Sequence, residues 1–146
     1  MIIRRLVTIL GLAVLLSAAT RGAVADGPIV NGDSSQHELH FDRTPQRIIT
    51  LLPSLTETVC ALGECARLVA TDRCSEWPAS VKSLPKVGGL DDAQIEPIVS
   101  LQPDLVILAY QARVTGRLHE LDVKALVVET GTYADIARAV RAIGLL

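Results

Sequence analysis

The chain has 146 residues and a formal net charge of −2, from 14 basic and 16 acidic residues. This length is enough for one domain, and the charge gives no sign of a nucleic-acid-binding surface. Only 3% of the residues are aromatic, no Cys-x-x-Cys occurs, and the three histidines show no metal-ligand spacing. We therefore expect neither a nucleic-acid partner nor a metal site.

The first segment, Met1–Ala25, has the design of a secretory signal peptide. Arg4 and Arg5 precede an apolar run from Leu6 to Ala19, and the small residues Ala23–Ala25 fit a cleavage site. An uncleaved membrane anchor is the alternative, but the run is shorter than the roughly 20 residues that a spanning helix needs. We expect cleavage at the end of this segment, and no lipid anchor because no suitable cysteine lies near the cut.

The mature chain is predicted to start with a flexible segment, residues 26–37, which is rich in Gly, Asp and Ser. Glu38–Phe41 is expected to add a short edge strand. The first buried strand is predicted at Arg47–Leu52, an apolar run with branched residues at its centre, and Pro53 ends it.

A helix is predicted to follow this strand. Ser54 stands three residues before Glu57, which is the spacing of a capping box, and Gly63 falls where a left-handed cap ends a helix. The apolar residues of its buried face follow at helical spacing: Leu55, Val59 and Leu62. A helix start after a strand directs free backbone N–H groups at the carboxyl end of the sheet, where α/β proteins bind ligands.

Three cysteines leave at least one unpaired. Cys60 and Cys65 flank the predicted helix end and could pair across it in the oxidising compartment that export implies. The favoured interpretation is that Cys60 is a small buried residue on the apolar face of the helix. Cys74 lies in a predicted loop, Asp72–Pro78.

The remaining elements alternate between strand and helix. Further strands are predicted at Leu68–Thr71, Leu105–Tyr110 and Ala125–Glu129, and further helices at Gln94–Leu101, Val114–Leu121 and after Thr132. Thr132 and Asp135 repeat the capping spacing. The residues expected to turn inward are Leu118, Leu121, Ile136, Val140 and Ile143. This alternation predicts an α/β fold with a parallel four-stranded sheet and helices on both of its faces.

An ordered series of short motifs resembles a known family. The motifs are Pro45–Ile49, Leu52–Glu57, Cys74–Pro78, Val87–Gly89, Ile95–Val99 and Leu101–Ile107. They resemble the Rossmann-like amino-terminal lobe of periplasmic substrate-binding proteins of ABC importers for vitamin B12, ferric siderophores and haem. The resemblance covers about Glu38 to Ile143. It implies a two-lobed periplasmic protein with one linking helix, of which residues 38–146 are the first lobe, truncated before the second.

The resemblance also implies where a ligand lies, in a cleft lined by the turns at the carboxyl ends of the strands. The expected contact residues are Pro53, Ser54, Thr56, Cys74, Trp77, Gly89 and Leu90. Ser54 serves equally well as a plain helix cap. Trp77 could stack on a flat ligand, although packing against Pro78 and the lobe surface is the favoured interpretation. Leu90 stands where the closest vitamin B12 binders place a tryptophan, so it keeps apolar area and loses a flat face.

Glu96 matches the position at which members of this family dock on arginines of the permease. A carboxylate in the first turn of a helix is in any case favoured by about 0.3–1 kcal/mol, and an exposed one remains free to pair with arginine.

The expected function is capture of a metal chelate for an ABC importer, with a corrinoid ranked first and haem or a ferric siderophore second. A siderophore would favour basic residues in the cleft, so the positions of Arg113 and Arg117 matter. No G-x-G-x-x-G, G-x-S-x-G or P-loop occurs, so neither an enzyme nor a cofactor is expected. The alternative is a truncated, ligand-free interaction protein that keeps only the docking lobe.

Overall fold

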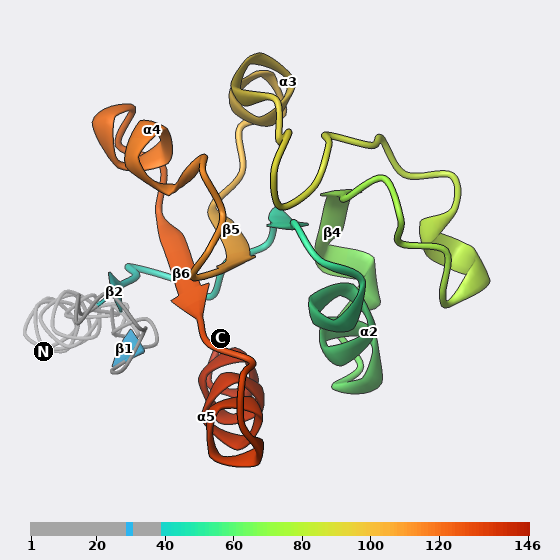
Figure 1. Ribbon diagram of the computed structural model, residues 1–146, viewed down its shortest axis with the longest axis vertical. Helices are drawn as coiled ribbons and strands as arrows, with labels where there is room; N and C mark the ends of the chain where they lie inside the picture. The colour runs from blue at the N-terminus through green and yellow to red at the C-terminus, as the bar shows by residue number, and fades with distance from the viewer. Residues whose placement is uncertain (1–28, 31–38) are drawn as a thin grey trace, which may run out of the picture.

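The computed structural model describes residues 29–30 and 39–146 (Figure 1). The expected signal peptide lies outside the described residues, as does most of segment 26–37. Within that segment, Ile29–Val30 forms strand β1 and pairs antiparallel with β2, Leu39–His40. The expected edge strand is therefore present as β2, but it belongs to a separate two-stranded ribbon. No helix in the described part of the chain combines the length and apolarity needed to cross a membrane.

The predicted parallel sheet is confirmed. Its strands are β3 (Ile48–Thr50), β4 (Leu68–Thr71), β5 (Leu105–Ala109) and β6 (Ala125–Val128), in the order β4-β3-β5-β6. Every neighbouring pair is parallel. All five residues of β5 are buried, as expected for a central strand with both faces covered.

Helices cover both faces of this sheet (Figure 1). α2 (Pro53–Ala61) and α5 (Tyr133–Gly144) lie on one side, and α3 (Ile95–Ser100) and α4 (Thr115–Glu120) lie on the other. Side chains along β5 alternate between two cores: Leu105 and Ile107 join the residues of α2 and α5, and Val106 and Leu108 join those of α3 and α4. Two short 3-10 turns, η1 (Cys65–Arg67) and η2 (Ala79–Val81), complete the described elements.

The start of α2 differs from the prediction. Leu52 is the N-cap and makes no side-chain capping bond, because Pro53 occupies the first helical position, where its fixed φ suits a helix. Ser54 therefore lies inside the first turn, and its carbonyl accepts a bond of 2.7 Å from the Thr58 hydroxyl. The capping box predicted at Ser54 is wrong.

The predicted end of α2 at Gly63 is confirmed. Gly63 has φ +91° and donates to the Cys60 carbonyl at 3.0 Å, and Glu64 donates to the Val59 carbonyl at 3.1 Å. These two bonds form a Schellman motif, which satisfies carbonyls that the helix end leaves open. Leu62, predicted to face inward, is instead 41% exposed, because it follows the last helical residue.

Cys60 and Cys65 form a disulfide, with 4.1 Å between their Cα atoms. The favoured interpretation of Cys60 as an unpaired buried residue is therefore wrong. The Schellman turn reverses the chain between the two cysteines, which brings their side chains together. Cys74 is free and exposed.

The capping box of α5 is confirmed, since Asp135 N–H donates to the Thr132 hydroxyl at 3.2 Å and Thr132 N–H donates to the Asp135 carboxylate at 2.8 Å. The bond from the Thr132 side chain is the main cause that lowers the pKa of Asp135, with a further contribution from Arg138. The predicted inward face is only partly correct: α5 packs through Ala139, Ala142 and Ile143. Small alanines let the helix approach closely, which turns Ile136 and Val140 to the surface, and Leu121 after α4 is also exposed.

Candidate functional site

The candidate site is the edge of the sheet at which all four parallel strands end. The turn after β3 leads into Pro53, and the strand order places it between the segments that follow β4 and β5. Ser54 is exposed in the first turn of α2, beside a half-buried Pro53. This is the edge at which open α/β sheets bind ligands.

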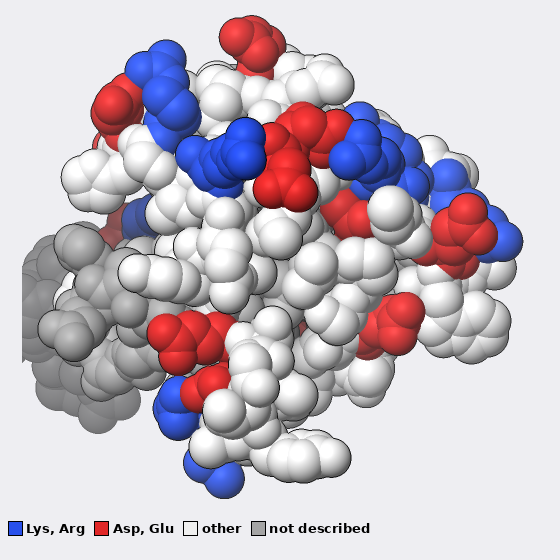
Figure 2. All heavy atoms as spheres, in the orientation of Figure 1, with Lys and Arg blue, Asp and Glu red and all other residues white. Residues whose placement is uncertain are grey.

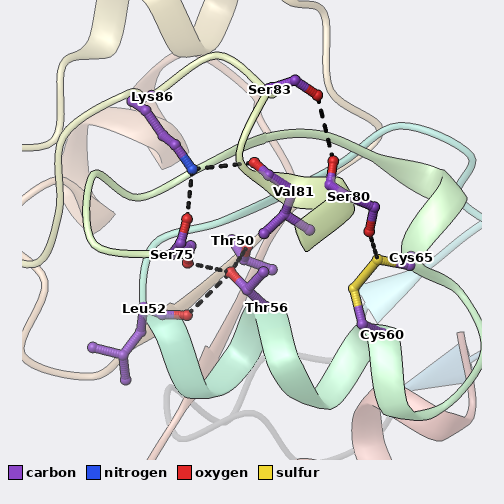
Figure 3. The surroundings of a disulfide bond; sticks show 10 residues. All are labelled: Thr50, Leu52, Thr56, Cys60, Cys65, Ser75, Ser80, Val81, Ser83 and Lys86. Atoms are coloured by element: carbon purple, nitrogen blue, oxygen red, sulfur yellow. Dashed lines mark hydrogen bonds between the residues drawn. A yellow bond between two sulfur atoms is a disulfide. The ribbon is translucent and has the colours of Figure 1, made fainter. Parts of the chain in front are cut away.

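Thr56 lies beneath this edge and not on it. Its exposed fraction is 0%, and its hydroxyl oxygen lies 2.6 Å from that of Thr50 and 2.7 Å from that of Ser75 (Figure 3). Ser75 in turn donates to a carboxylate oxygen of the buried Asp72, and the other oxygen accepts from Cys74 N–H at 2.7 Å. Thr56 therefore connects β3 and α2 to the loop after β4, so any contribution of its hydroxyl to binding is indirect.

The loop after β4 presents Cys74 and Trp77 at the surface. Trp77 is 69% exposed and precedes Pro78 through a cis peptide bond. The interpretation that Trp77 packs against the lobe surface is wrong, because most of the indole has no protein neighbour. An exposed aromatic face of this kind is available for stacking on a flat ligand.

The segment around Gly89 and Leu90 lies against that loop. Arg73 N–H donates to the Gly88 carbonyl at 2.8 Å, and the Arg73 side chain pairs with Asp92. Asp92 also accepts from Gly89 N–H at 2.9 Å. These contacts bring together two predicted site segments that lie 15 residues apart in sequence, from Cys74 to Gly89. Leu90 is half-buried against the core of the α3 and α4 side.

The arginines near this edge each have an acidic neighbour. Arg73 pairs with Asp92, and Arg113 Nε lies 3.9 Å from a carboxylate oxygen of Asp91. Arg117 pairs with a glutamate within α4. Figure 2 shows acidic and basic side chains side by side in the upper part of the view, above a largely uncharged area. On the face drawn in Figure 2, the basic side chains in the upper part of the view therefore lie beside acidic ones.

Two exposed tyrosines escaped the sequence-based prediction. Tyr110 directly follows β5 and is 57% exposed, and Tyr133 begins α5 after β6 and is 94% exposed. With Trp77, three of the four aromatic residues of the chain follow the carboxyl ends of sheet strands. An aromatic residue directly after a buried apolar run was the signal available for Tyr110.

Glu96 is exposed in the first turn of α3, as predicted. It lies on the helical layer of α3 and α4, outside the turns after β3 and β4. In the part of the chain that the structure describes, no group of three or more His, Cys, Asp or Glu side chains is arranged to hold a metal ion.

Known proteins are similar to this chain in sequence or in structure. An uncharacterised ABC transporter substrate-binding lipoprotein of Bacillus subtilis, YvrC, is 27% identical over 123 residues, which are 80% of this chain and 39% of that protein. The solved vitamin B12 binding protein BtuF of Vibrio cholerae gives a TM-score of 0.64 at 31% identity, over 68% of this chain and 40% of that one. A periplasmic haem binding protein of Pseudomonas aeruginosa gives 0.65 at 28%, over 69% and 38%.

The chain thus spans about two fifths of the length of each of these three proteins. The model of a family described as periplasmic binding protein matches residues 48–146, which is more than half of the chain. The chain belongs to the periplasmic binding protein family.

Proposed function

We propose that this chain is the amino-terminal lobe of the substrate-binding component of an ABC importer, which captures a metal chelate in the periplasm. The observation that carries the proposal is the exposed edge of the sheet, where Trp77, Tyr110 and Tyr133 follow three different strands. Aromatic side chains bury large areas against flat ligands at low entropic cost. The similarity to binding proteins for vitamin B12 and haem supports the same class of ligand.

Within that class a corrinoid is the better candidate. Haem carries propionates and many ferric siderophores are anionic, so both favour unpaired cations in the site. Here Arg73 and Arg113 already have carboxylate neighbours. Trp77 offers a stacking face but no atom that ligates iron, whereas the phenol oxygens of Tyr110 and Tyr133 are of a type that ligates haem iron, so the preference for a corrinoid rests on the paired charges. A corrin ring bearing neutral amides suits a surface of exposed aromatics and paired charges, although Leu90 provides no flat face.

Titration of the full chain with cyanocobalamin, haemin and a ferric catecholate siderophore, which is anionic, tests this proposal. One lobe covers only one side of a chelate, whereas good pockets bury 70–90% of a drug-sized ligand. We expect cyanocobalamin to bind with a Kd of about 100 μM or weaker, roughly −5.5 kcal/mol, and the other two chelates more weakly. A form that carries both lobes should bind in the micromolar range or tighter. Calorimetry and quenching of Trp77, the only tryptophan, provide two independent measurements.

Trp77→Leu tests the contribution of the indole, since leucine keeps apolar area and removes the flat aromatic face. It should weaken binding in calorimetry by about fivefold to tenfold, in line with the energy of one aromatic contact. Submicromolar binding by the single lobe would refute the need for a second lobe. A two-lobed form that binds none of the three chelates would refute the ligand class.

The docking role proposed for Glu96 predicts a separate result. In a two-lobed form, Glu96→Arg should weaken association with the permease at least tenfold, because it replaces a carboxylate partner of arginine with a like charge. Chelate affinity should stay within twofold, since Glu96 lies outside the candidate site. Glu57→Arg, an equal charge reversal on the opposite helical layer, is the control. The measurement is the affinity of each variant for the permease in detergent or nanodiscs, and we expect only Glu96→Arg to weaken it.

Equal effects of the two reversals would contradict the docking assignment. If Glu96→Arg alone weakens association while no chelate binds, the better assignment is the ligand-free interaction lobe that keeps only the docking function.

A further inference from the structure

Lys86 is placed unusually for a surface lysine. Its ammonium group donates to the Thr71 hydroxyl at 2.8 Å, to the Ser75 carbonyl at 2.7 Å and to the Val81 carbonyl at 3.2 Å (Figure 3 shows the two carbonyl bonds). An ammonium has three N–H donors, so all of them are used within the protein. Surface lysines ordinarily leave this group in water.

The three acceptors are spread along one segment. Thr71 is the last residue of β4, Ser75 is in the middle of the exposed loop, and Val81 is the last residue of η2. The ammonium group of Lys86 therefore binds the beginning, middle and end of segment 71–81, which carries Cys74 and Trp77.

The opposite side of this segment is held by different bonds. The hydroxyls of Thr50, Thr56 and Ser75 form a chain that ends on the Asp72 carboxylate (Figure 3 shows the three hydroxyls). The backbone oxygen of Ser75 accepts from Lys86 and its side chain belongs to the hydroxyl chain, so both sets of bonds meet at this residue. Cys74 and Trp77 remain exposed on either side of it, one residue before and two residues after.

We propose that Lys86 is a positioning residue, which fixes the conformation of residues 72–78 so that Cys74 and Trp77 are presented to the ligand before it binds. The three hydrogen bonds of the ammonium group support the first part of this proposal, that Lys86 orders the loop. The second part, that the ordered loop serves a ligand, rests on the proposed function. Preorganisation of this kind removes the entropy cost of ordering a loop during binding.

Hydrogen exchange in the unliganded full chain tests the first part. Lys86→Met keeps most of the aliphatic stem and removes the ammonium, and Lys82→Met removes the same charge from an exposed position four residues earlier. Hydrogen bonds from charged donors are among the stronger ones in proteins. We expect exchange at the Cys74 and Ser75 amides to accelerate about tenfold to a hundredfold in Lys86→Met only. Time-resolved anisotropy of Trp77 should show added fast motion in the same variant.

Exchange in peptides from α5 is the internal reference, since a general loss of stability would raise it as well. Faster exchange confined to residues 73–81 would support the positioning role. Unchanged exchange at those amides, or an equal rise throughout the chain, would overturn it.

If Lys86→Met fails to fold, Lys86→Arg is the second variant, because it keeps the positive charge. A planar guanidinium cannot direct its donors at the same three converging oxygens, so loop exchange should still rise at least threefold. Wild-type exchange in Lys86→Arg would show that charge alone suffices and would overturn the geometric role.

A cyanocobalamin titration tests the second part separately. In a two-lobed form, where micromolar binding is expected, Lys86→Met should weaken affinity at least fivefold, and Lys82→Met should leave it unchanged. Equal affinities of the wild type and Lys86→Met would overturn the preorganisation claim. Failure of a two-lobed wild type to bind any chelate would refute the proposed ligand class, while the exchange result would still decide whether Lys86 orders the loop.

Discussion

Replacing Gly88 with alanine is expected to destabilise the protein by about 3 kcal/mol or more, whereas the same change at Gly63 should cost about 1 kcal/mol. Both glycines have positive φ, +93° at Gly88 and +91° at Gly63. They differ in their surroundings. A Cβ at Gly88 would lie 2.4 Å from the Asp92 carbonyl oxygen and 2.8 Å from the Ala93 Cα, whereas a Cβ at Gly63 would meet nothing within 4 Å.

The contact at Gly88 cannot be relieved by a side-chain rotation, because the atoms it meets belong to the backbone. The segment of Asp92 would have to move, and with it the ion pair to Arg73 and the bond to Gly89. The loop after β4 should therefore lose its support as well as its stability.

Urea denaturation of the two variants measures the difference directly. Gly116→Ala in α4 is a useful control, since its Cβ meets nothing and an alanine in a helix should be neutral or stabilising by about 0.5–1 kcal/mol. Equal losses of stability at Gly63 and Gly88 would show that backbone conformation alone sets the cost and would contradict the steric argument.

The sheet was predictable because each strand carries its own signal. β5 is a continuous apolar run between Pro103-Asp104 and a polar loop, and such a run has few alternatives in a chain of this length. The capping box of α5 was predictable for the same reason, since Thr132 and Asp135 satisfy each other locally. Interactions that depend on neighbours close in sequence leave a pattern that can be read.

Features that depend on distant packing left no such pattern. The rotation of α5 that exposes Ile136 and Val140 follows from the close approach of Ala139 and Ala142, and helical spacing alone cannot rank the two faces. The disulfide depends on the reversal of the chain after Gly63, which spacing permits but does not require. Proline at the first position of α2 overrode a capping signal at Ser54.

The same distinction between local and distant interactions applies to the candidate site. Its location was predictable, because the carboxyl ends of parallel strands share one edge. The roles of its individual side chains were not predictable. Thr56 lies at the right sequence position, yet its hydroxyl is used by Thr50 and Ser75, whereas Trp77 projects into solvent. Which hydroxyl is satisfied internally depends on a partner 19 residues away, and no local rule identifies it.

Replacing Asp72 with alanine is the second change expected to have a large effect, with a loss of about 2–3 kcal/mol. Asp72 is only 2% exposed, and its two carboxylate oxygens accept from Cys74 N–H and from the Ser75 hydroxyl. Alanine would leave both donors without this acceptor and would disconnect the loop from the hydroxyl chain. Asp72→Asn has the same shape and one acceptor oxygen, so it should cost about 1 kcal/mol.

The double variant Asp72→Ala with Lys86→Met tests whether the two sets of bonds at Ser75 act together. If they hold one ordered loop, the loop is already loosened once either is removed, and the second change costs less than it does alone. The combined loss of stability should then fall short of the sum of the single losses by about 1 kcal/mol. Additive losses would mean that Asp72 and Lys86 stabilise the loop independently, because residues in one cooperative network couple and separate ones do not.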